Sequence, residues 1–256
     1  MNRLCAENLS VRLGGNMVVA QANLALEAGQ LIALVGPNGA GKTTLVRALA
    51  GLIPADGVVT VDGQKLATLT AAERARKIAY LPQGHSFHWP VTAEAIVALG
   101  RYPHADLFSG LSAADSDAVC RAMIATGTDA LAQRIVTTLS GGERARVALA
   151  RALATEAPTL LADEPTASLD PRHQLVVMEL LRHAARAGGT VLAIVHDLTL
   201  AARFADRVIV MERGHIVADG APDDALSVRR MADVFGVEAV VVEIDGRRLP
   251  MAQRPI

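Results

Sequence analysis

The sequence predicts an α/β fold in which helices cover both faces of a largely parallel sheet. In the C-terminal half, short apolar segments of strand length alternate with helical segments, beginning at TLLADEP (159–165). A glycine-rich segment, GPNGAGKTT (36–44), separates an apolar strand from a helix. Between about 85 and 139 the pattern changes to consecutive helices. Strands that alternate with helices are typical of such sheets.

Composition narrows the class of protein. The 256 residues allow one large domain or two small ones, and a hydrophobic fraction of 51% is ample for a core. The net charge of -1, without a long basic run, argues against nucleic acid as a partner. No apolar run approaches the ~18 residues that cross a bilayer, and the N-terminus lacks a hydrophobic signal core, so we expect a cytoplasmic protein. Cys5 and Cys120 are expected to be free thiols.

The first 84 residues predict antiparallel strands followed by the start of the α/β core. LSVRL (9–13) alternates in polarity before a Gly-Gly turn, and a second strand follows it. LIALVG (31–36) is typical of a buried strand, and LVRALAGL (45–52) of a helix. VVTVDGQKL (58–66) has the Asp-Gly turn of a hairpin, and IAYLPQ (78–83) predicts another strand.

The remaining elements complete a single predicted domain over 1–256. LSGGERARVALARAL (139–153) and MELLRHAARAGG (178–189) have helical periodicity, and TVLAIVHD (190–197) is strand-like. A helix over 222–236 and a hairpin over 238–250 are expected near the end. We predict three parts, which are a core of 1–84 and 140–220, a helical subdomain of 85–139, and a C-terminal helix and hairpin of 221–256.

The segment GPNGAGKTT fits the phosphate-binding pattern G-x-x-x-x-G-K-[ST], and it lies between a strand and a helix as that pattern requires. Its glycines let backbone N–H groups surround phosphate oxygens, and the helix N-terminus adds positive charge. We expect Lys42 to reach the β- and γ-phosphates, Thr43 to bind Mg²⁺ and Thr44 to hold phosphate. The predicted fold is therefore an α/β P-loop NTPase (RecA-like) core with an N-terminal antiparallel β-subdomain and an inserted α-helical subdomain. The nucleotide-contacting residues would be Gly36, Pro37, Asn38, Gly39, Ala40, Gly41, Lys42, Thr43 and Thr44.

Polar side chains follow three of the predicted strands. Asp163 and Glu164 end one strand, where an Asp can hold Mg²⁺ and the adjacent Glu can reach an attacking water. Gln83 and His196 end two others, and ligands of open parallel sheets bind at such carboxyl ends. Taken singly, each group is more often a solvated or structural side chain. Together with the glycine-rich loop they predict a site for the γ-phosphate.

At this point the sequence resembles a family, the ATP-binding subunits of ABC transporters, over about residues 1–235. GPNGAGKTT resembles the Walker A motif, TLLADEP the Walker B motif, and LSGGE (139–143) the ABC signature. SLD (168–170) is similar to the D-loop, Gln83 to the Q-loop glutamine, and His196 to the switch histidine. The subtype is indicated by PVTAEAIVALGRYPH (90–104) and MADVFGV (231–237). These stretches are similar to the ATPases of importers for ferric siderophores, haem and cobalamin.

The resemblance implies a mechanism and partners. Two cassettes, expected to be identical chains, would face each other head to tail, with Ser140, Gly141 and Gly142 of one chain on the γ-phosphate held by the other. A side chain at either glycine would block that approach. The implied catalytic residues are Glu164, His196, Gln83 and Lys42, the Mg²⁺ ligands are Thr43, Gln83 and Asp163, and Asp170 contacts nucleotide. The assembly would hydrolyse ATP on the cytoplasmic face of the membrane, with permease subunits and, indirectly, a solute-binding protein.

One feature departs from the family pattern. Family members usually stack an aromatic residue on adenine, whereas Val11 or Leu13 stands at the candidate positions here, so we expect GTP to be tolerated.

Ferric siderophore is the first substrate expected, with haem and cobalamin next, although the subtype stretches could be helix-packing residues. Arg101 and Tyr102 are candidate docking residues for the permease, so Arg101→Glu should uncouple transport. The alternatives are an ATPase of another transporter class and a soluble ABC-type ATPase.

Overall fold

The computed structural model describes residues 2–84, 87–104, 110–244 and 246–256. The chain forms two compact units. The first consists of Met1–Thr68 together with Leu181–Ile256, and the second of Leu69–Leu180. Helix α6 (Pro171–Arg186) begins in the second unit and ends in the first. The predicted three-part division of the chain remains a prediction.

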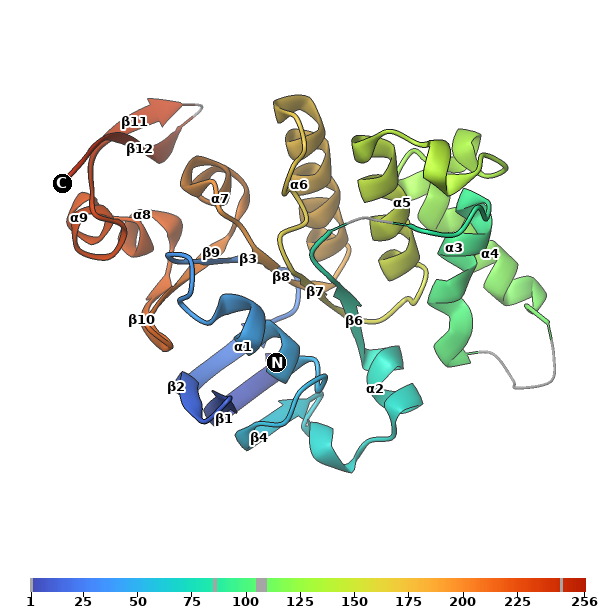
Figure 1. Cartoon of the computed structure of the whole chain (residues 1–256), viewed down its shortest axis with the longest axis horizontal. Coiled ribbons are helices and arrows are strands. Elements are labelled where there is room, and N and C mark those ends of the chain that lie inside the picture. The colour runs from blue at the N-terminus through green and yellow to red at the C-terminus, as the bar shows by residue number, and fades with distance from the viewer. Residues whose placement is uncertain (1, 85–86, 105–109, 245) are drawn as a thin grey trace. The chain divides into compact units, whose positions relative to one another are not determined.

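An antiparallel sheet with the strand order β2-β1-β4-β5 opens the first unit, as the sequence predicted (Figure 1). Gly14 and Gly15 form the turn between β1 and β2, and both have positive φ angles. Asp62 and Gly63 form the turn of the predicted hairpin between β4 and β5, which pair Thr60 with Lys65. The four strands are β1 (Asn2–Leu13), β2 (Asn16–Glu27), β4 (Asp56–Val61) and β5 (Gln64–Lys65).

The second sheet of this unit is parallel apart from its edge. Strand β3 (Leu31–Val35) pairs in parallel with β8 (Thr190–Ile194) on one side and β9 (Arg207–Glu212) on the other. Strand β10 (His215–Gly220) adds antiparallel to β9. Every residue of β3 and β8 is buried, which explains their continuous apolar sequences. Helices α1 (Lys42–Leu49) and α7 (Leu198–Phe204) follow β3 and β8.

The C-terminal part of the unit departs from expectation in one respect. The single helix predicted over 222–236 is two helices, α8 (Pro222–Ala225) and α9 (Val228–Phe235). They are separate because Leu226 and Ser227 have non-helical ψ angles of 35° and 151°. The predicted hairpin is present as β11 (Val237–Ile244) and β12 (Arg247–Pro255), which pair antiparallel.

The second unit holds the parallel pair β6 (Ile78–Leu81) and β7 (Thr159–Ala162) together with its helices. Helices α3 (Ala93–Ala98), α4 (Ala113–Ala125) and α5 (Gly141–Leu153) pack on one another; α3 and α4 are green and α5 yellow-green in Figure 1. Val97, Val119, Met123, Val136 and Val147 lie in their shared core. The α-helices that lie wholly within this unit are α2 (Ala71–Lys77), α3 (Ala93–Ala98), α4 (Ala113–Ala125) and α5 (Gly141–Leu153). Short 3-10 turns at Leu99–His104, Asp129–Leu131 and Val136–Thr138 connect them.

Candidate functional site

The glycine-rich loop lies between β3 and α1 in the first unit. Gly36 has φ 151°, and a Cβ atom there would overlap the carbonyl oxygen of Met211, so only glycine fits. Lys42 is buried, and its Nζ donates to the carbonyl oxygens of Gly36 at 2.7 Å and Pro37 at 2.9 Å. Gly41 at the N-cap of α1 has no side chain with which to cap the helix, and a helix start of this kind favours a bound anion.

His196 lies in the same unit, directly after β8 and its continuation at Val195. Because β8 and β3 are parallel neighbours, and Val195 N donates to Leu34 O at 3.1 Å, His196 and the glycine-rich loop leave the sheet at the same edge. The imidazole is exposed. The adjacent Asp197 caps α7, accepting from the N–H groups of Thr199 and Leu200. This arrangement agrees with the prediction that both segments follow carboxyl ends of strands.

The second unit brings three predicted residues together at the ends of β6 and β7. Gln83 Nε2 donates to Glu164 Oε2 at 2.6 Å. Asp163 is fully buried, and its Oδ2 accepts from the hydroxyl of Tyr80 at 3.0 Å. Glu164 has φ 52°, an uncommon left-handed conformation for a residue with a side chain. Such local strain occurs at functional sites, where the surrounding structure holds it in place.

The segment LSGGE begins α5 with a reciprocal capping box. The Ser140 hydroxyl accepts from Glu143 N at 3.3 Å, and Glu143 Oε2 accepts from Ser140 N at 2.7 Å. The N–H of Ser140 is the main reason that the pKa of Glu143 is lowered. Ser140 and Gly141 are exposed, whereas Gly142 is buried. The helix start therefore presents one serine and one glycine outward.

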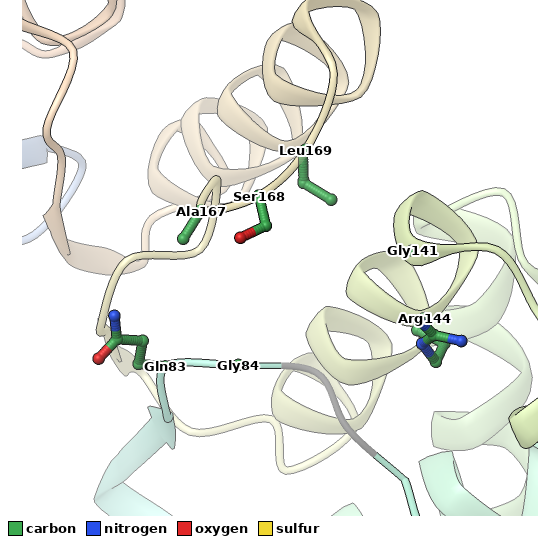
Figure 2. A pocket seen from close by; sticks show the side chains of 7 residues that line it. All are labelled: Gln83, Gly84, Gly141, Arg144, Ala167, Ser168 and Leu169. Carbon is green, nitrogen blue, oxygen red and sulfur yellow. The ribbon is translucent and has the colours of Figure 1, made fainter.

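Gly141 also lines a pocket of about 550 Å³ in the second unit (Figure 2). Gly141 and Arg144 belong to α5, and Figure 2 shows them across the pocket from the turn that carries Ser168. Ser168 has φ 60°, a second left-handed residue at a predicted functional segment. The pocket is lined by Gln83, Gly84, Gly141, Arg144, Ala167, Ser168 and Leu169. Residues of the predicted Q-loop, signature and D-loop thus share one concave surface.

Two residues of this unit that contact the predicted site were not predicted from the sequence. Tyr80 contacts the predicted Mg²⁺ ligand Asp163, and His173 Nδ1 lies 2.8 Å from Asp170 Oδ2. The backbone N–H of His173 is the main reason that the pKa of Asp170 is lowered. The only signal for Tyr80 was a hydroxyl in an otherwise apolar strand. The sequence carried no signal for His173, because this residue is three positions beyond the D-loop motif.

Arg101 is buried and cannot contact a partner, so its predicted docking role is wrong. The residue is only 5% exposed. Its guanidinium donates to Asp115 Oδ1 at 2.8 Å, to Ala154 O at 2.8 Å and to Glu156 Oε2 at 2.9 Å. Ser112 and Arg101 together lower the pKa of Asp115 to about 2. Arg101 therefore joins α4 to the end of α5, and Arg101→Glu would disrupt the fold rather than uncouple transport.

Replacement of Arg101 by Ala is expected to lower the thermal unfolding midpoint by roughly 10 °C, because it leaves the buried Asp115 carboxylate without its cation. The matched control is Arg121→Ala. Arg121 also pairs with Glu156, but its side chain is 62% exposed, and such pairs contribute little. Differential scanning calorimetry of both variants checks the prediction. Equal midpoints for the two would contradict the structural role of Arg101.

Comparison with known proteins identifies the class that this fold and site define. Residues 19–167, more than half of the chain, match the family model described as ABC transporter. The chain therefore belongs to the ABC transporter family, and it is an ATP-binding, ATP-hydrolysing subunit. Its predicted family and its α/β P-loop NTPase fold are confirmed.

Particular relatives refine the comparison. The hemin import ATP-binding protein HmuV of Streptomyces coelicolor is 47% identical over 90% of this chain and 82% of its own length. The HmuV protein of Pseudomonas aeruginosa is 41% identical over 97% and 98% of the two chains. A cobalamin import ATP-binding protein BtuD of Halobacterium salinarum is 43% identical over 91% of this chain and 58% of its own length.

A solved structure extends the likeness to the whole chain. An inward-facing metal-chelate type ABC transporter gives a TM-score of 0.84 at 25% identity, covering 99% of both chains. A dimeric ATP-binding cassette in a post-hydrolysis state with ADP and Pi gives 0.72 at 26% identity, covering 86% of this chain and 98% of that one. Among the described residues, no helix is both long and apolar enough to cross a membrane.

Proposed function

We propose that this chain is the ATPase subunit of an importer for a metal chelate, and we place haem first. Relatives that are 41–47% identical over most of the chain carry hemin import in their names, and a cobalamin relative is 43% identical. The stretches 90–104 and 231–237, which are similar to importers for siderophores, haem and cobalamin, are compatible with this class of importer. Siderophore, haem and cobalamin are therefore compared in one experiment below.

The hydrogen bond between Gln83 and Glu164 is the observation that carries the hydrolytic role. It holds Glu164 Oε2 at 2.6 Å from Gln83 Nε2, directly beside the buried Asp163. In this position Glu164 would orient or deprotonate the attacking water, and Gln83 would keep its carboxylate in place. Lys42 would stabilise charge on the phosphoryl group, and His196 would contact the γ-phosphate and the water.

Gln83 and Asp163 of the second unit offer oxygen atoms, which Mg²⁺ prefers, and a cation stabilises a buried carboxylate such as that of Asp163. The hydroxyl of Thr43, in the first unit, is the third ligand that we expect. When bound, Mg²⁺ would neutralise charge on the β- and γ-phosphates. The hydroxyl of Tyr80 holds one Asp163 oxygen and would fix the orientation of this carboxylate.

A second copy of the chain would complete each nucleotide site. Ser140, Gly141 and Asp170 are exposed, as residues that meet another chain's ATP must be, and Gly141 lines the pocket of Figure 2. The dimeric cassette cited above supports this pairing. Permease subunits would bind the pair at the cytoplasmic face of the membrane, where Tyr102, 74% exposed, remains a docking candidate. A solute-binding protein would act indirectly, through the permease.

The substrate is tested by reconstituting the chain and its permease in proteoliposomes with the cognate solute-binding protein. ATP hydrolysis is measured after addition of haemin, a ferric siderophore or cobalamin. We expect haemin to stimulate hydrolysis most. Stimulation by the siderophore alone would restore the original order of preference. Equal rates with all three and with none would contradict the proposed class of substrate.

Leu13, rather than Val11, is the residue that would meet the nucleotide base. Val11 is 1% exposed, whereas Leu13 is 47% exposed at the end of β1. The paired strand β2 lies against the glycine-rich loop, since a Cβ atom at Gly41 would be 2.6 Å from Val18 O. An aliphatic side chain gives no aromatic stacking, so base selectivity should be weak.

Replacement of Leu13 by Tyr is therefore expected to tighten binding of both ATP and GTP about fivefold, the equivalent of ~1 kcal/mol of stacking, because both bases offer a ring face. The measurement is the dissociation constant of each nucleotide. Leu52→Tyr is the control, because Leu52 is a similarly exposed leucine beyond α1. A strong ATP preference in the unmodified chain would contradict the expected tolerance of GTP.

A further inference from the structure

Gly142 lies where its own chain leaves no room for a side chain. It is buried in the first turn of α5, in a helical conformation that any residue could adopt. A Cβ atom at Gly142 would lie 2.6 Å from both Cγ and Nε2 of His173, and closer still to Cδ2. The need for glycine at this position is therefore steric, and it arises from His173.

The neighbouring Gly141 differs in this respect. It is exposed, no atom of the described residues lies within 4 Å of its potential Cβ position, and it lines the pocket of Figure 2. No residue that the structure describes excludes a side chain there. The two signature positions therefore require glycine for different reasons. At Gly142 the reason is the neighbouring His173, and at Gly141 it is the expected approach of another chain's nucleotide.

His173 is fixed where it meets Gly142. Its side chain is 25% exposed, and Nδ1 lies 2.8 Å from Asp170 Oδ2, where an Nδ1–H would donate. The backbone N–H of His173 donates to the other oxygen of Asp170 at 2.9 Å. Because Asp170 directly precedes α6, both contacts also hold the first turn of that helix. The contacts with Asp170 restrain the ring against Gly142, so a larger residue 142 must displace either the ring or the start of α5.

We propose that His173 is a positioning residue for ATP hydrolysis. Held by Asp170, its imidazole packs on Gly142 and sets the first turn of α5 relative to the loop that carries Ser168. These are the two segments that we assign to the other chain's nucleotide, so the proposal rests on the proposed function. His173 touches no reacting atom and acts through Gly142. A displacement of about 1 Å at such a site lowers rates about 10²-fold.

The test is a set of variants of the full chain in its permease complex. Gly142→Ala should lower kcat about 10²-fold through displacement of α5. His173→Ala removes every ring atom that faces Gly142 but keeps the backbone N–H that donates to Asp170 Oδ1, so kcat should fall about tenfold through loss of positioning. The double variant Gly142→Ala/His173→Ala, in which the new methyl group meets no ring, should be more active than Gly142→Ala alone. Gly141→Ala is the matched control, and His173→Ala should not rescue it.

Three measurements separate the outcomes. The kcat and KM for ATP report positioning, binding of a fluorescent ATP analogue reports the Walker A loop, and the thermal unfolding midpoint reports folding. A double variant no more active than Gly142→Ala would overturn the proposal. If Gly142→Ala does not fold, recovery of folding by His173→Ala is the supporting result and its absence the opposing one. An unmodified chain without hydrolysis would count against the proposed function, and the unfolding midpoints would still test the steric fit.

Discussion

Replacement of Glu164 by Gln is expected to lower kcat for ATP hydrolysis by about 10²- to 10⁴-fold, the usual contribution of a general base. The amide oxygen of Gln can still accept the hydrogen bond that Gln83 donates to Glu164 Oε2, so the local geometry should persist. What is lost is the carboxylate that orients or deprotonates water. Steady-state hydrolysis by the permease complex is the measurement.

A measurement of ATP binding by the Glu164→Gln variant distinguishes a loss of catalysis from a general loss of folding or binding. The variant should bind ATP with unchanged affinity, because the glycine-rich loop of residues 36–44 is intact. With binding retained and hydrolysis lost, two ATP-bound chains should accumulate as a stable pair, which gel filtration detects. Glu179→Gln, at an exposed position of α6, serves as the control for charge removal. A kcat close to that of the unmodified chain would refute the role of Glu164.

Replacement of Lys42 by Ala is expected to weaken ATP binding about 10- to 100-fold, because hydrogen bonds to charged groups contribute about 1.5–3 kcal/mol. In the structure the ammonium already lies inside the loop, bonded to the carbonyl oxygens of Gly36 and Pro37. It would exchange these partners for phosphate oxygens. Isothermal titration calorimetry with Mg-ATP measures the loss directly.

The control for Lys42 comes from the chain itself, which has only three lysines. Lys65 is exposed on β5, so Lys65→Ala removes the same charge away from the loop and should leave affinity unchanged. Equal affinities for the two variants would contradict phosphate binding by Lys42. Unfolding midpoints of both show whether the loop survives the loss of its two carbonyl contacts.

Those parts of the fold and site that depend on short stretches were predictable from the sequence. LIALV is continuously apolar because β3 is a central parallel strand, and the glycines after it predict the turn into α1. Asp62 and Gly63 identify the β4–β5 hairpin in the same way. Gln83 and Glu164 were each placed at a strand end, but their contact depends on the parallel pairing of β6 with β7.

Contacts between segments far apart in the sequence could not be predicted. Arg101 was expected to contact the permease, which requires an exposed side chain, and arginine is rarely buried unless it is paired. Its partners Asp115 and Glu156 are 14 and 55 residues away, and no pattern joins them. The same holds for Tyr80 with Asp163 and for His173 with Gly142. Burial of a polar side chain depends on partners that only the fold assembles.

Affinity purification of the tagged chain from detergent-solubilised membranes, followed by mass spectrometry and an ATPase assay of the purified complex, tests the proposed function most directly. We expect a polytopic permease to co-purify in equal amount, with ATP hydrolysis that depends on Glu164. Such a complex would identify the chain as a transporter subunit that works in pairs at the membrane. Recovery of soluble proteins alone, or of none, would contradict the proposal and favour a soluble ABC-type ATPase.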